Sequence, residues 1–421
     1  MNKIVRASAS TSTFTSALIW FGAAVSIAEI LTGMLIAPLG LAGGLGAILL
    51  GHLIGGIPLL LAGLIGAQTG QNAMGTVKRA FGFGGGALFS LLNVVQLVGW
   101  TAVMIAAGAA VAQQVFALAW PWLWPAIIAA LIIVWITVGN RGLTILSVVS
   151  VMALLVLSVM LSLEVFAGAL PGLGALMGGG APGTAAAEAA GSDVVAAAAQ
   201  EAGGISFGTA VELSAAMPLS WLPLISDYTR RAAHKTASPV VSVATYSLVS
   251  CWMFSIGLGV VLFTQADDLA AVFLASGLGL AALFTAVLST TTTTFLDANS
   301  AGESASSIFP RVNAKAAACV ACLLGLVIAL VAPSSSYEEF LYLIGSVFAP
   351  MSAVQIVDYF ILKNDSSAKP CNVTNLAVWA VGFVGARLLV GSETVIGISL
   401  PVMLACAALA LLVAGARRLL R

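Results

Sequence analysis

Apolar segments separated by short polar breaks make up almost the whole of this chain. A helix needs about 20 mainly apolar residues to cross a bilayer, and twelve such segments occur among the 421 residues. By residue number they cover 15–39, 43–68, 83–114, 122–139, 143–169, 204–226, 237–264, 270–298, 315–332, 338–361, 373–391 and 395–416. The pattern predicts an all-α integral membrane protein with 12 transmembrane helices, forming one domain over residues 1–421.

The composition supports this prediction and narrows the choice of partners. Hydrophobic residues make up 60% of the chain and charged residues 8%, so a lipid bilayer is the expected surrounding. The formal net charge is zero and no run of basic residues occurs, which argues against a nucleic-acid partner. The residues before the first span lack the pattern of a cleavable signal, so we expect that span to be retained.

Charged residues are distributed unevenly between the two sets of alternate breaks. One set holds every Lys and Arg except Arg387, whereas the other holds acidic residues such as Glu188 and Glu338 but no basic residue. Basic residues mark the cytoplasmic side of a membrane protein. We therefore expect both termini in the cytoplasm, which requires an even number of spans, and a location in a bacterial-type inner (plasma) membrane.

The first span carries a carboxylate, Glu29, near its middle. An ionisable group at that depth costs roughly 2.5–3.5 kcal/mol on insertion scales, so it usually faces a cavity or a partner. Small residues nearby, among them Gly22 and Ser26, favour an interrupted helix of the kind that transporters use to bind solutes. The alternative is a continuous helix with one satisfied polar residue in a packed bundle.

The interruption of the first span recurs in the sixth, where Pro218 and Pro223 remove backbone donors. The interval from Ser26 to the middle of this second break is 193 residues, and the polar patch at Gln96 recurs in the eighth span after 195. Two intervals of nearly the same length predict an inverted repeat of five plus five spans. The expected divisions are a first repeat at 1–170, an external loop at 171–203, a second repeat at 204–362, and two further spans at 373–421.

A run of five threonines, Thr290 to Thr294, lies in the eighth span. Hydroxyl and carbonyl oxygens are the ligands that hard cations prefer. Thr292 and Thr293, together with carbonyls freed at Gly22 and Ser26, therefore form a candidate Na⁺ site. The alternative is that the threonine hydroxyls bond back to their own helix and bend it.

A second group of polar and aromatic residues favours a flat heteroaromatic solute. Gln96 and Trp100 are four residues apart, which puts an amide and an indole on one helical face. Such a pair can hydrogen-bond to a planar ring and stack on it. Trp221, beside Pro218, is a candidate second wall, and Asp297 follows the threonine run by about one helical turn.

Several longer segments resemble the nucleobase–cation symporter-1 family. They are SDYTRR at 226–231, KRAFGFGG at the start of the third span, the Gly99–Trp100 pair, and IGSVFAPMSAVQIVDYFILK at 344–363. The resemblance implies a LeuT-type five-plus-five repeat with two extra spans. It also implies that Trp100 stacks on the solute, that Gln96 helps to bind it, and that the four candidate cation ligands hold the coupling ion.

Within that family, the first span and the segment TTTTTFLDANSAGES are most similar to transporters of hydroxymethylpyrimidine, a thiamine precursor. The chain departs from the cytosine-permease pattern at Met217–Pro218 and carries acids at Glu29 and Asp297 where small residues are usual. Acidic groups suit a solute with more hydrogen-bond donors than cytosine. We therefore expect an importer of a small pyrimidine, driven by Na⁺ or H⁺ and needing no other cofactor.

Other functions remain open or are disfavoured. Cytosine or other nucleobase or allantoin-type transport and a non-transporting membrane sensor both stay as alternatives. A channel is disfavoured because the polar groups cluster at one depth, and an enzyme because two histidines without a metal-ligand cluster offer no catalytic set. His52, Glu164 and Glu212 have no assigned role, and the oligomeric state is open.

Overall fold

A computed structural model describes residues 10–138, 140–166, 205–264, 279–331, 337–392 and 394–419. Within these ranges the chain is helical apart from turns, short connections and a single parallel bridge between Thr11 and Ala232. The predicted external loop at 171–203 lies outside the described residues.

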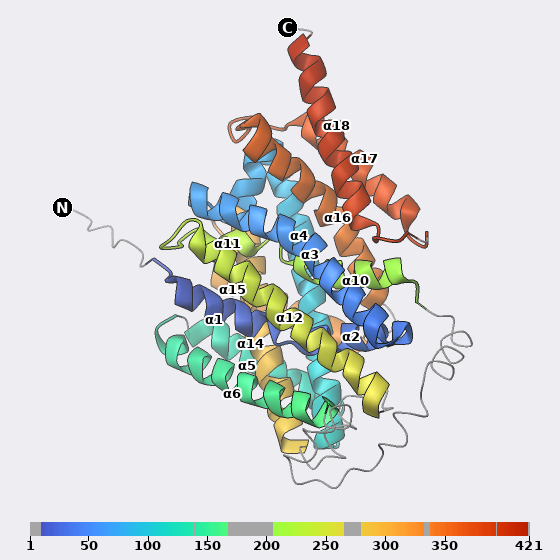
Figure 1. Cartoon of the computed structure of the whole chain (residues 1–421). Coiled ribbons are helices and arrows are strands. Elements are labelled where there is room, and N and C mark those ends of the chain that lie inside the picture. The colour runs from blue at the N-terminus through green and yellow to red at the C-terminus, as the bar shows by residue number, and fades with distance from the viewer. Residues whose placement is uncertain are drawn as a thin grey trace, which may run out of the picture.

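The helices follow the predicted order of apolar segments (Figure 1). In the first half of the chain they are α1 (Thr13–Ala24), α2 (Ile27–Leu35), the 3₁₀ turn η1 (Ala37–Leu39), α3 (Gly40–Thr69), α4 (Ala73–Val115), α5 (Leu123–Val138) and α6 (Asn140–Phe166). In the second half they are α10 (Phe207–Ser220), α11 (Ile225–Thr229), α12 (Ala237–Thr264), α14 (Gly279–Ile308), α15 (Ala314–Val331), α16 (Tyr337–Ile356), the π-helical turn η3 (Val357–Leu362), α17 (Val373–Leu389) and α18 (Ser399–Leu419).

Seven helices of the described chain are long and apolar enough to cross a membrane, and an eighth span results if the bent pair α1 and α2 is one crossing. α5 and α17 are apolar but shorter, while α10 and α14 carry many polar residues. Both of these polar helices contribute to the central site described below. The total of 12 transmembrane helices therefore remains a prediction.

The predicted interruption of the first span is present. α1 and α2 meet at an angle of 51°, and the break consists of Val25 and Ser26. The Ser26 hydroxyl accepts a hydrogen bond from the Ala28 amide at 3.1 Å, which caps the N-terminus of α2. The break is thus stabilised locally, by a serine of the kind that favours helix starts.

The sixth span is also interrupted, but not where the first of its prolines led us to expect. α10 continues through Pro218 as far as Ser220, and the break covers 221–224, which includes Pro223. The Pro218 ring lies against Gly55 of α3, where an added Cβ would meet the ring at 2.4 Å. Pro218 therefore serves helix packing, and the break begins two residues after Leu219, the predicted middle of the interruption.

Two helices differ from their predicted limits for local reasons. α4 begins at Ala73, ten residues before the predicted span, and bends at Gly82, which has φ of 76°. The loop carbonyls of Lys369 and Pro370 accept hydrogen bonds from the amides of residues 83 and 84 at 3.0 and 2.7 Å. These two amides are therefore hydrogen-bonded despite the bend. α14 extends ten residues beyond its predicted end, and its polar last turns bond to Asn72, Asn93 and Arg230.

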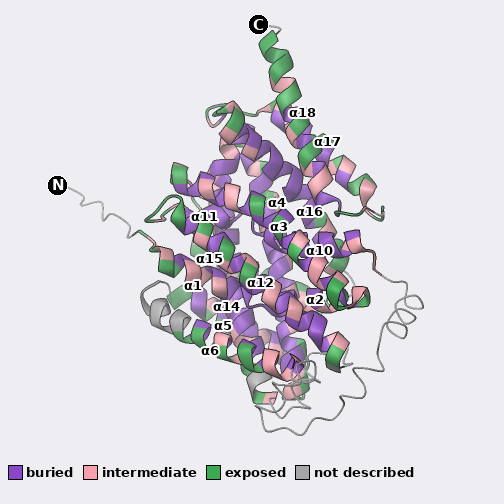
Figure 2. Cartoon of the chain, viewed as in Figure 1, coloured by how far each residue is buried: buried purple, intermediate pink, exposed green. Residues whose placement is uncertain are grey.

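Close contacts between helices hold the broken spans in the middle of the bundle. α1 and α2 pack along α12, α10 packs along α3, and α14 packs along α4. Gly33 of α2 and Gly257 of α12 allow this approach, since a Cβ on either would meet the partner's backbone carbonyl at 2.1 or 1.9 Å. Figure 2 shows buried residues along these inner helices, and exposed residues on the end of α18 that projects beyond them.

Candidate substrate site

A small cavity of about 20 Å³ lies where the two broken spans meet α4 and α14. Its walls come from α1, α2, α4, α10, α14 and the breaks that follow α1 and α10. The lining residues are Ala23, Ser26, Ala28, Glu29, Trp100, Met104, Met217, Ser220, Trp221, Thr293 and Asp297. Six of the residues predicted from sequence as ligands of the solute or cation are thus brought together, although they are up to 271 positions apart.

Two residues of the cavity wall carry buried polar atoms that have no partner among the described residues. Glu29 Oε1 accepts a hydrogen bond from the Tyr246 hydroxyl at 2.8 Å, but Glu29 Oε2 has no partner among the described residues. The indole Nε1 of Trp100 is likewise buried without an acceptor in that part of the chain. A buried polar group without a partner is costly, so these atoms are suited to a bound solute.

Asp297 adds a second carboxylate to the same cavity. Its side chain is 4% exposed, and it comes from α14, whereas Glu29 comes from α2. The cavity lining includes no Lys or Arg. The site is therefore rich in acceptors and favours ligands that carry several N–H or O–H donors.

Gln96 and Pro218 do not line this cavity. The Gln96 amide donates to the Ser220 carbonyl at 2.9 Å and to Asn93 Oδ1 at 3.2 Å, which ties α4 to the end of α10. Its Oε1 is buried without a partner in the described chain. In this structure Gln96 thus contacts the broken helix rather than the cavity.

A set of oxygens between α1 and α14 could hold a small cation. Thr293 Oγ1 donates to the Gly22 carbonyl at 3.3 Å, and Ser289 Oγ donates to the Val25 carbonyl at 2.6 Å. Two carbonyls released by the end of α1 thus face two hydroxyls of α14, which is a suitable donor set for Na⁺.

This oxygen set differs in part from the predicted one. The Thr292 hydroxyl bonds back to the Leu288 and Ser289 carbonyls at 2.9 and 3.1 Å, and the Ser26 hydroxyl caps α2. Ser289 and Val25 were not predicted. Ser289 lies one residue before the threonine run, so only its contact with the break identifies it.

Aromatic rings join both breaks to α12. Trp20 of α1 is 1% exposed and makes edge contacts with Trp221, Tyr228 and Tyr246, at ring-centroid distances of 5.3, 6.2 and 5.7 Å. Tyr246 also bonds to Glu29, so this cluster extends to the cavity. Sequence reasoning missed Trp20 and Tyr246, because single aromatic residues in apolar helices give no signal of their own.

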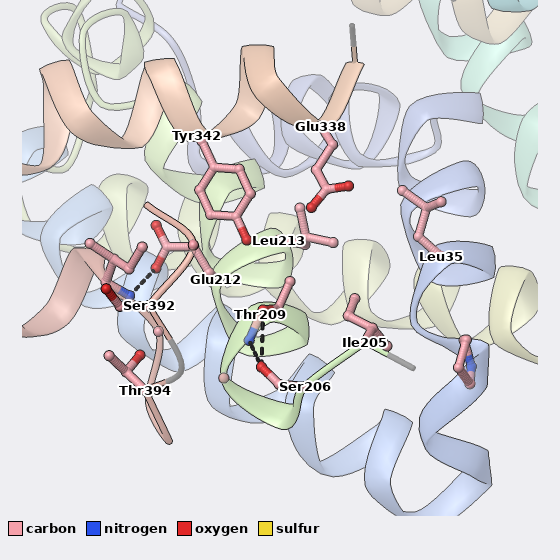
Figure 3. Close-up of a pocket in the computed structure, with 15 residues that line it drawn as sticks. Leu35, Ile205, Ser206, Thr209, Glu212, Leu213, Glu338, Tyr342, Ser392 and Thr394 are labelled. Carbon is pink, nitrogen blue, oxygen red and sulfur yellow. Dashed lines mark hydrogen bonds between the residues drawn. The ribbon is translucent and has the colours of Figure 1, made fainter. Parts of the chain in front are cut away.

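A larger cavity of about 420 Å³, here called the vestibule, opens at the end of the bundle near Pro38 and Ser206. Figure 3 shows Glu338 and Tyr342 projecting from α16 toward Thr209 of α10, with Glu212 deeper in the wall. The first turns of α16 separate the vestibule from the central cavity. On their inner side the Tyr337 hydroxyl lies 2.9 Å from Thr32 Oγ1, and the Phe340 ring makes an edge contact with Trp100 at 5.5 Å.

Glu212 connects α10 to α18. Its carboxylate accepts hydrogen bonds from the Ile398 and Ser399 amides at 2.7 and 2.8 Å and from the Ser399 hydroxyl at 2.6 Å. These donors form the N-terminus of α18, which an anion stabilises. Glu212 is therefore a structural cap between a broken span and a helix outside the predicted repeat.

Replacing Glu212 by Gln should lower thermal stability, because the Gln amide presents a donor where the carboxylate accepted three hydrogen bonds. We expect a loss of about 1–3 kcal/mol, the range for a buried polar group left unpaired. Thermal unfolding of the detergent-solubilised protein measures the loss. Glu338→Gln, an exposed acid of the same vestibule, is the control, and equal melting of both variants would contradict the capping role.

The opposite end of the bundle is closed by polar contacts. Arg230 after α11 forms an ion pair with Glu303 of α14 at 3.2 Å, and the Thr11 amide donates to the Arg231 carbonyl at 2.8 Å. Arg79 pairs with Asp365 at 3.0 Å. Hydrogen bonds from Ser367, with help from Arg79, hold the pKa of the Asp365 carboxyl below its usual range.

Residues 5–409 match the family described as "Permease for cytosine/purines, uracil, thiamine, allantoin". The chain belongs to this permease family. It is accordingly a multi-pass membrane transporter of small molecules and not an enzyme. No curated protein sequence matches this permease significantly.

Three solved structures are similar to the permease along nearly its whole length. Mhp1, a nucleobase-cation-symport-1 family transporter, closed with bromovinylhydantoin bound, has a TM-score of 0.76 and 19% identity, covering 96% of this chain and 91% of its own. The inward-facing conformation of Mhp1 has a TM-score of 0.68 and 18% identity, and the match covers 98% of this chain and 93% of the Mhp1 chain. A Na⁺-coupled sialic acid symporter in a substrate-bound, outward-open state has a TM-score of 0.66 and 13% identity. The match covers 96% of this chain and 90% of the symporter chain. The permease therefore has the LeuT-like fold.

Proposed function

We propose that this permease is a secondary active symporter that imports a small planar pyrimidine, with hydroxymethylpyrimidine as the first candidate. The observation that carries the proposal is the central cavity, where Trp100 and Trp221 lie beside two carboxylates. Indole faces suit a flat ring, and carboxylate oxygens suit the exocyclic amine and hydroxymethyl donors of such a solute. The unpaired Glu29 Oε2 supplies a specific acceptor for the amine.

Uracil lacks an exocyclic amine and would leave this acceptor unpaired. Cytosine has the amine but not the added hydroxyl, so it is the nearest alternative solute. A site built to hydrogen-bond a polar group discriminates strongly against analogues that lack it. We therefore expect binding affinity to decrease from hydroxymethylpyrimidine to cytosine and from cytosine to uracil.

The topology that we propose has 12 spans, both termini in the cytoplasm, and an inverted repeat of 1–170 and 204–362. The basic residues of the closed end, among them Arg79 and Arg230, support a cytoplasmic location for that end. The vestibule then opens to the outside. α16 would be the element that separates an outside solute from the central cavity.

Na⁺ is the coupling ion that the oxygens of Gly22, Val25, Ser289 and Thr293 support. Thr293→Ala should shift the Na⁺ dependence of uptake to higher concentration more than it changes affinity at saturating Na⁺. By linkage, Na⁺ and solute must tighten each other's binding by the same factor. Thr291→Ala is a matched control, since that hydroxyl bonds to Val287 of its own helix at 2.7 Å.

Solute binding that is indifferent to Na⁺, with uptake that follows a proton gradient, would assign H⁺ in place of Na⁺.

Counterflow in proteoliposomes tests transport itself. Vesicles loaded with unlabelled hydroxymethylpyrimidine or cytosine should accumulate the labelled compound transiently, because a carrier exchanges solute across the membrane. Binding without exchange would instead show a membrane sensor. Exchange of cytosine alone would assign the permease to nucleobase transport.

A further inference from the structure

Tyr246 of α12 contacts two residues of the central cavity without lining the cavity itself. Its hydroxyl donates to Glu29 Oε1 at 2.8 Å, and its ring makes an edge contact with Trp221 at a centroid distance of 6.0 Å. Glu29 and Trp221 both line the cavity. One tyrosine therefore touches both the proposed acceptor for the solute amine and one of the two indoles.

Packing of its ring holds the Tyr246 hydroxyl in place. The side chain is fully buried, at 0% exposure, and its ring also makes an edge contact with Trp20 at 5.7 Å. An indole from α1 and an indole from the second break thus contact the same phenol ring. Because a tyrosine has few side-chain torsions, these contacts fix the position of its hydroxyl oxygen.

The Glu29 carboxylate has one hydrogen bond in the described chain, and Tyr246 donates it. The terminal torsion of a glutamate is otherwise weakly restricted, because rotation about the bond to a planar carboxylate has a broad energy profile. The bond takes Oε1 and leaves Oε2 without a partner among the described residues. Tyr246 therefore determines which oxygen of Glu29 is available to a solute.

We propose that Tyr246 is a positioning residue that makes the site selective for amino-pyrimidines over oxo-pyrimidines. This inference rests on the proposed function, because it needs a pyrimidine that donates to Glu29. The Tyr246 hydroxyl fixes the carboxylate so that Oε2 meets an exocyclic amine. An exocyclic carbonyl in the same place meets the lone pairs of that oxygen and is repelled, so the wrong solute is rejected by an unfavourable contact.

A Glu29 carboxylate that was free to turn would discriminate less. Uracil carries a ring N–H beside its exocyclic carbonyl, whereas cytosine carries an unprotonated ring nitrogen beside its amine. A free carboxylate could rotate away from the carbonyl of uracil and accept a hydrogen bond from this ring N–H. The bond from Tyr246 prevents that adjustment. The selectivity thus depends on the tyrosine hydroxyl as well as on the charge of Glu29.

Tyr246→Phe tests the hydroxyl alone, because phenylalanine keeps the ring that contacts Trp20 and Trp221. Cytosine and uracil are the probes, since they differ at the exocyclic group and the ring nitrogen next to it. The preference for cytosine, measured as the ratio of the two dissociation constants at fixed Na⁺, should fall roughly five- to tenfold, about the effect of one hydrogen bond. An unchanged ratio overturns the proposal.

Tyr228→Phe is the matched control for the loss of a tyrosine hydroxyl. The Tyr228 ring also contacts Trp20, at 6.2 Å, but its hydroxyl donates to the Leu296 carbonyl at 2.9 Å. This variant should keep the wild-type ratio, even where its melting temperature falls. An equal fall of the ratio in both tyrosine variants would indicate a general loosening of the aromatic cluster and would overturn the positioning role.

Removing the carboxylate gives a second control. A Glu29→Ala variant has no carboxylate to orient, so adding Tyr246→Phe should leave the ratio where Glu29→Ala alone puts it. A further fall in the double variant would mean that Tyr246 acts on the solute by a route other than Glu29, against the proposal.

The orientation of Glu29 is measured in protein without solute. Infrared difference spectra against the matching Glu29→Gln variants locate the Glu29 carboxyl band in wild-type, Tyr246→Phe and Tyr228→Phe protein. The band should move in Tyr246→Phe, because the carboxyl group loses its hydrogen bond, and it should stay in place in Tyr228→Phe. A band that does not move in Tyr246→Phe overturns the positioning role.

The outcomes separate this inference from the proposed function. If cytosine and hydroxymethylpyrimidine both fail to bind the wild type, the proposed function is wrong and the selectivity part of this inference fails with it. The infrared spectra then still decide whether Tyr246 orients Glu29. If cytosine binds in preference to uracil and the preference survives Tyr246→Phe, the proposed function stands and this inference is wrong.

Discussion

Glu29→Gln should weaken aminopyrimidine binding by roughly ten- to hundred-fold, which corresponds to about 1.5–3 kcal/mol, the range for hydrogen bonds to charged groups. Gln keeps the shape of the side chain and one acceptor oxygen, but it removes the negative charge that faces the cavity. The Tyr246 hydroxyl can still donate to the amide oxygen, so the packing around the break should survive. Equilibrium binding of hydroxymethylpyrimidine and cytosine, measured at fixed Na⁺, checks the result.

Ligands without the exocyclic amine provide the control for this prediction. Uracil should bind wild-type protein and the Glu29→Gln variant about equally, and the Na⁺ dependence should persist in both. If the variant keeps its affinity for the aminopyrimidines and loses the pH dependence of uptake, Glu29 carries the coupling proton instead. That outcome would show that Glu29 does not recognise the solute.

Trp100→Ala is the second large effect that we expect. Stacking of a base on an aromatic side chain is worth about 1–3 kcal/mol by alanine substitution, so binding should weaken roughly five- to hundred-fold. The loss combines the missing ring face with the missing Nε1 donor, which has no acceptor in the described part of the protein. Isothermal titration or equilibrium dialysis with the same pyrimidines measures it.

Trp100→Phe distinguishes stacking from loss of the fold. Phenylalanine preserves a ring between the cavity and the edge contact with Phe340, so it should recover most of the affinity. Melting temperatures of both variants show whether the bundle remains intact. Unchanged affinity in a folded Trp100→Ala variant would exclude this indole from the site.

Trp100 also packs against α16, so its replacement affects a second region of the protein. Its ring packs on Tyr337 and Phe340, in the turns of α16 that separate the cavity from the vestibule. A solute that stacks on the indole therefore lies directly beneath these turns. The same side chain thus contacts both the cavity and the turns of α16 beside it.

The sequence by itself determined the class of the protein and singled out several residues that line the central cavity. Long apolar runs are sufficient to predict membrane helices, because crossing a bilayer requires length and hydrophobicity that can be read locally. Glu29 and the prolines of the sixth span stood out for a similar reason, since a carboxylate or a missing amide is costly within a membrane helix. Trp100, Trp221 and Asp297 were found on the strength of spacing and resemblance.

Only the tertiary structure decided which of these groups meet. Pro218 was expected at the site but packs on Gly55, and Gln96 bonds to the end of α10, because each side chain follows the rotation of its own helix. Ser289 and Tyr246 became visible through contacts with residues more than 200 positions away. A hydrogen bond depends on distances of a few tenths of an ångström, and such distances are set by how whole helices pack, which no local pattern along the chain specifies.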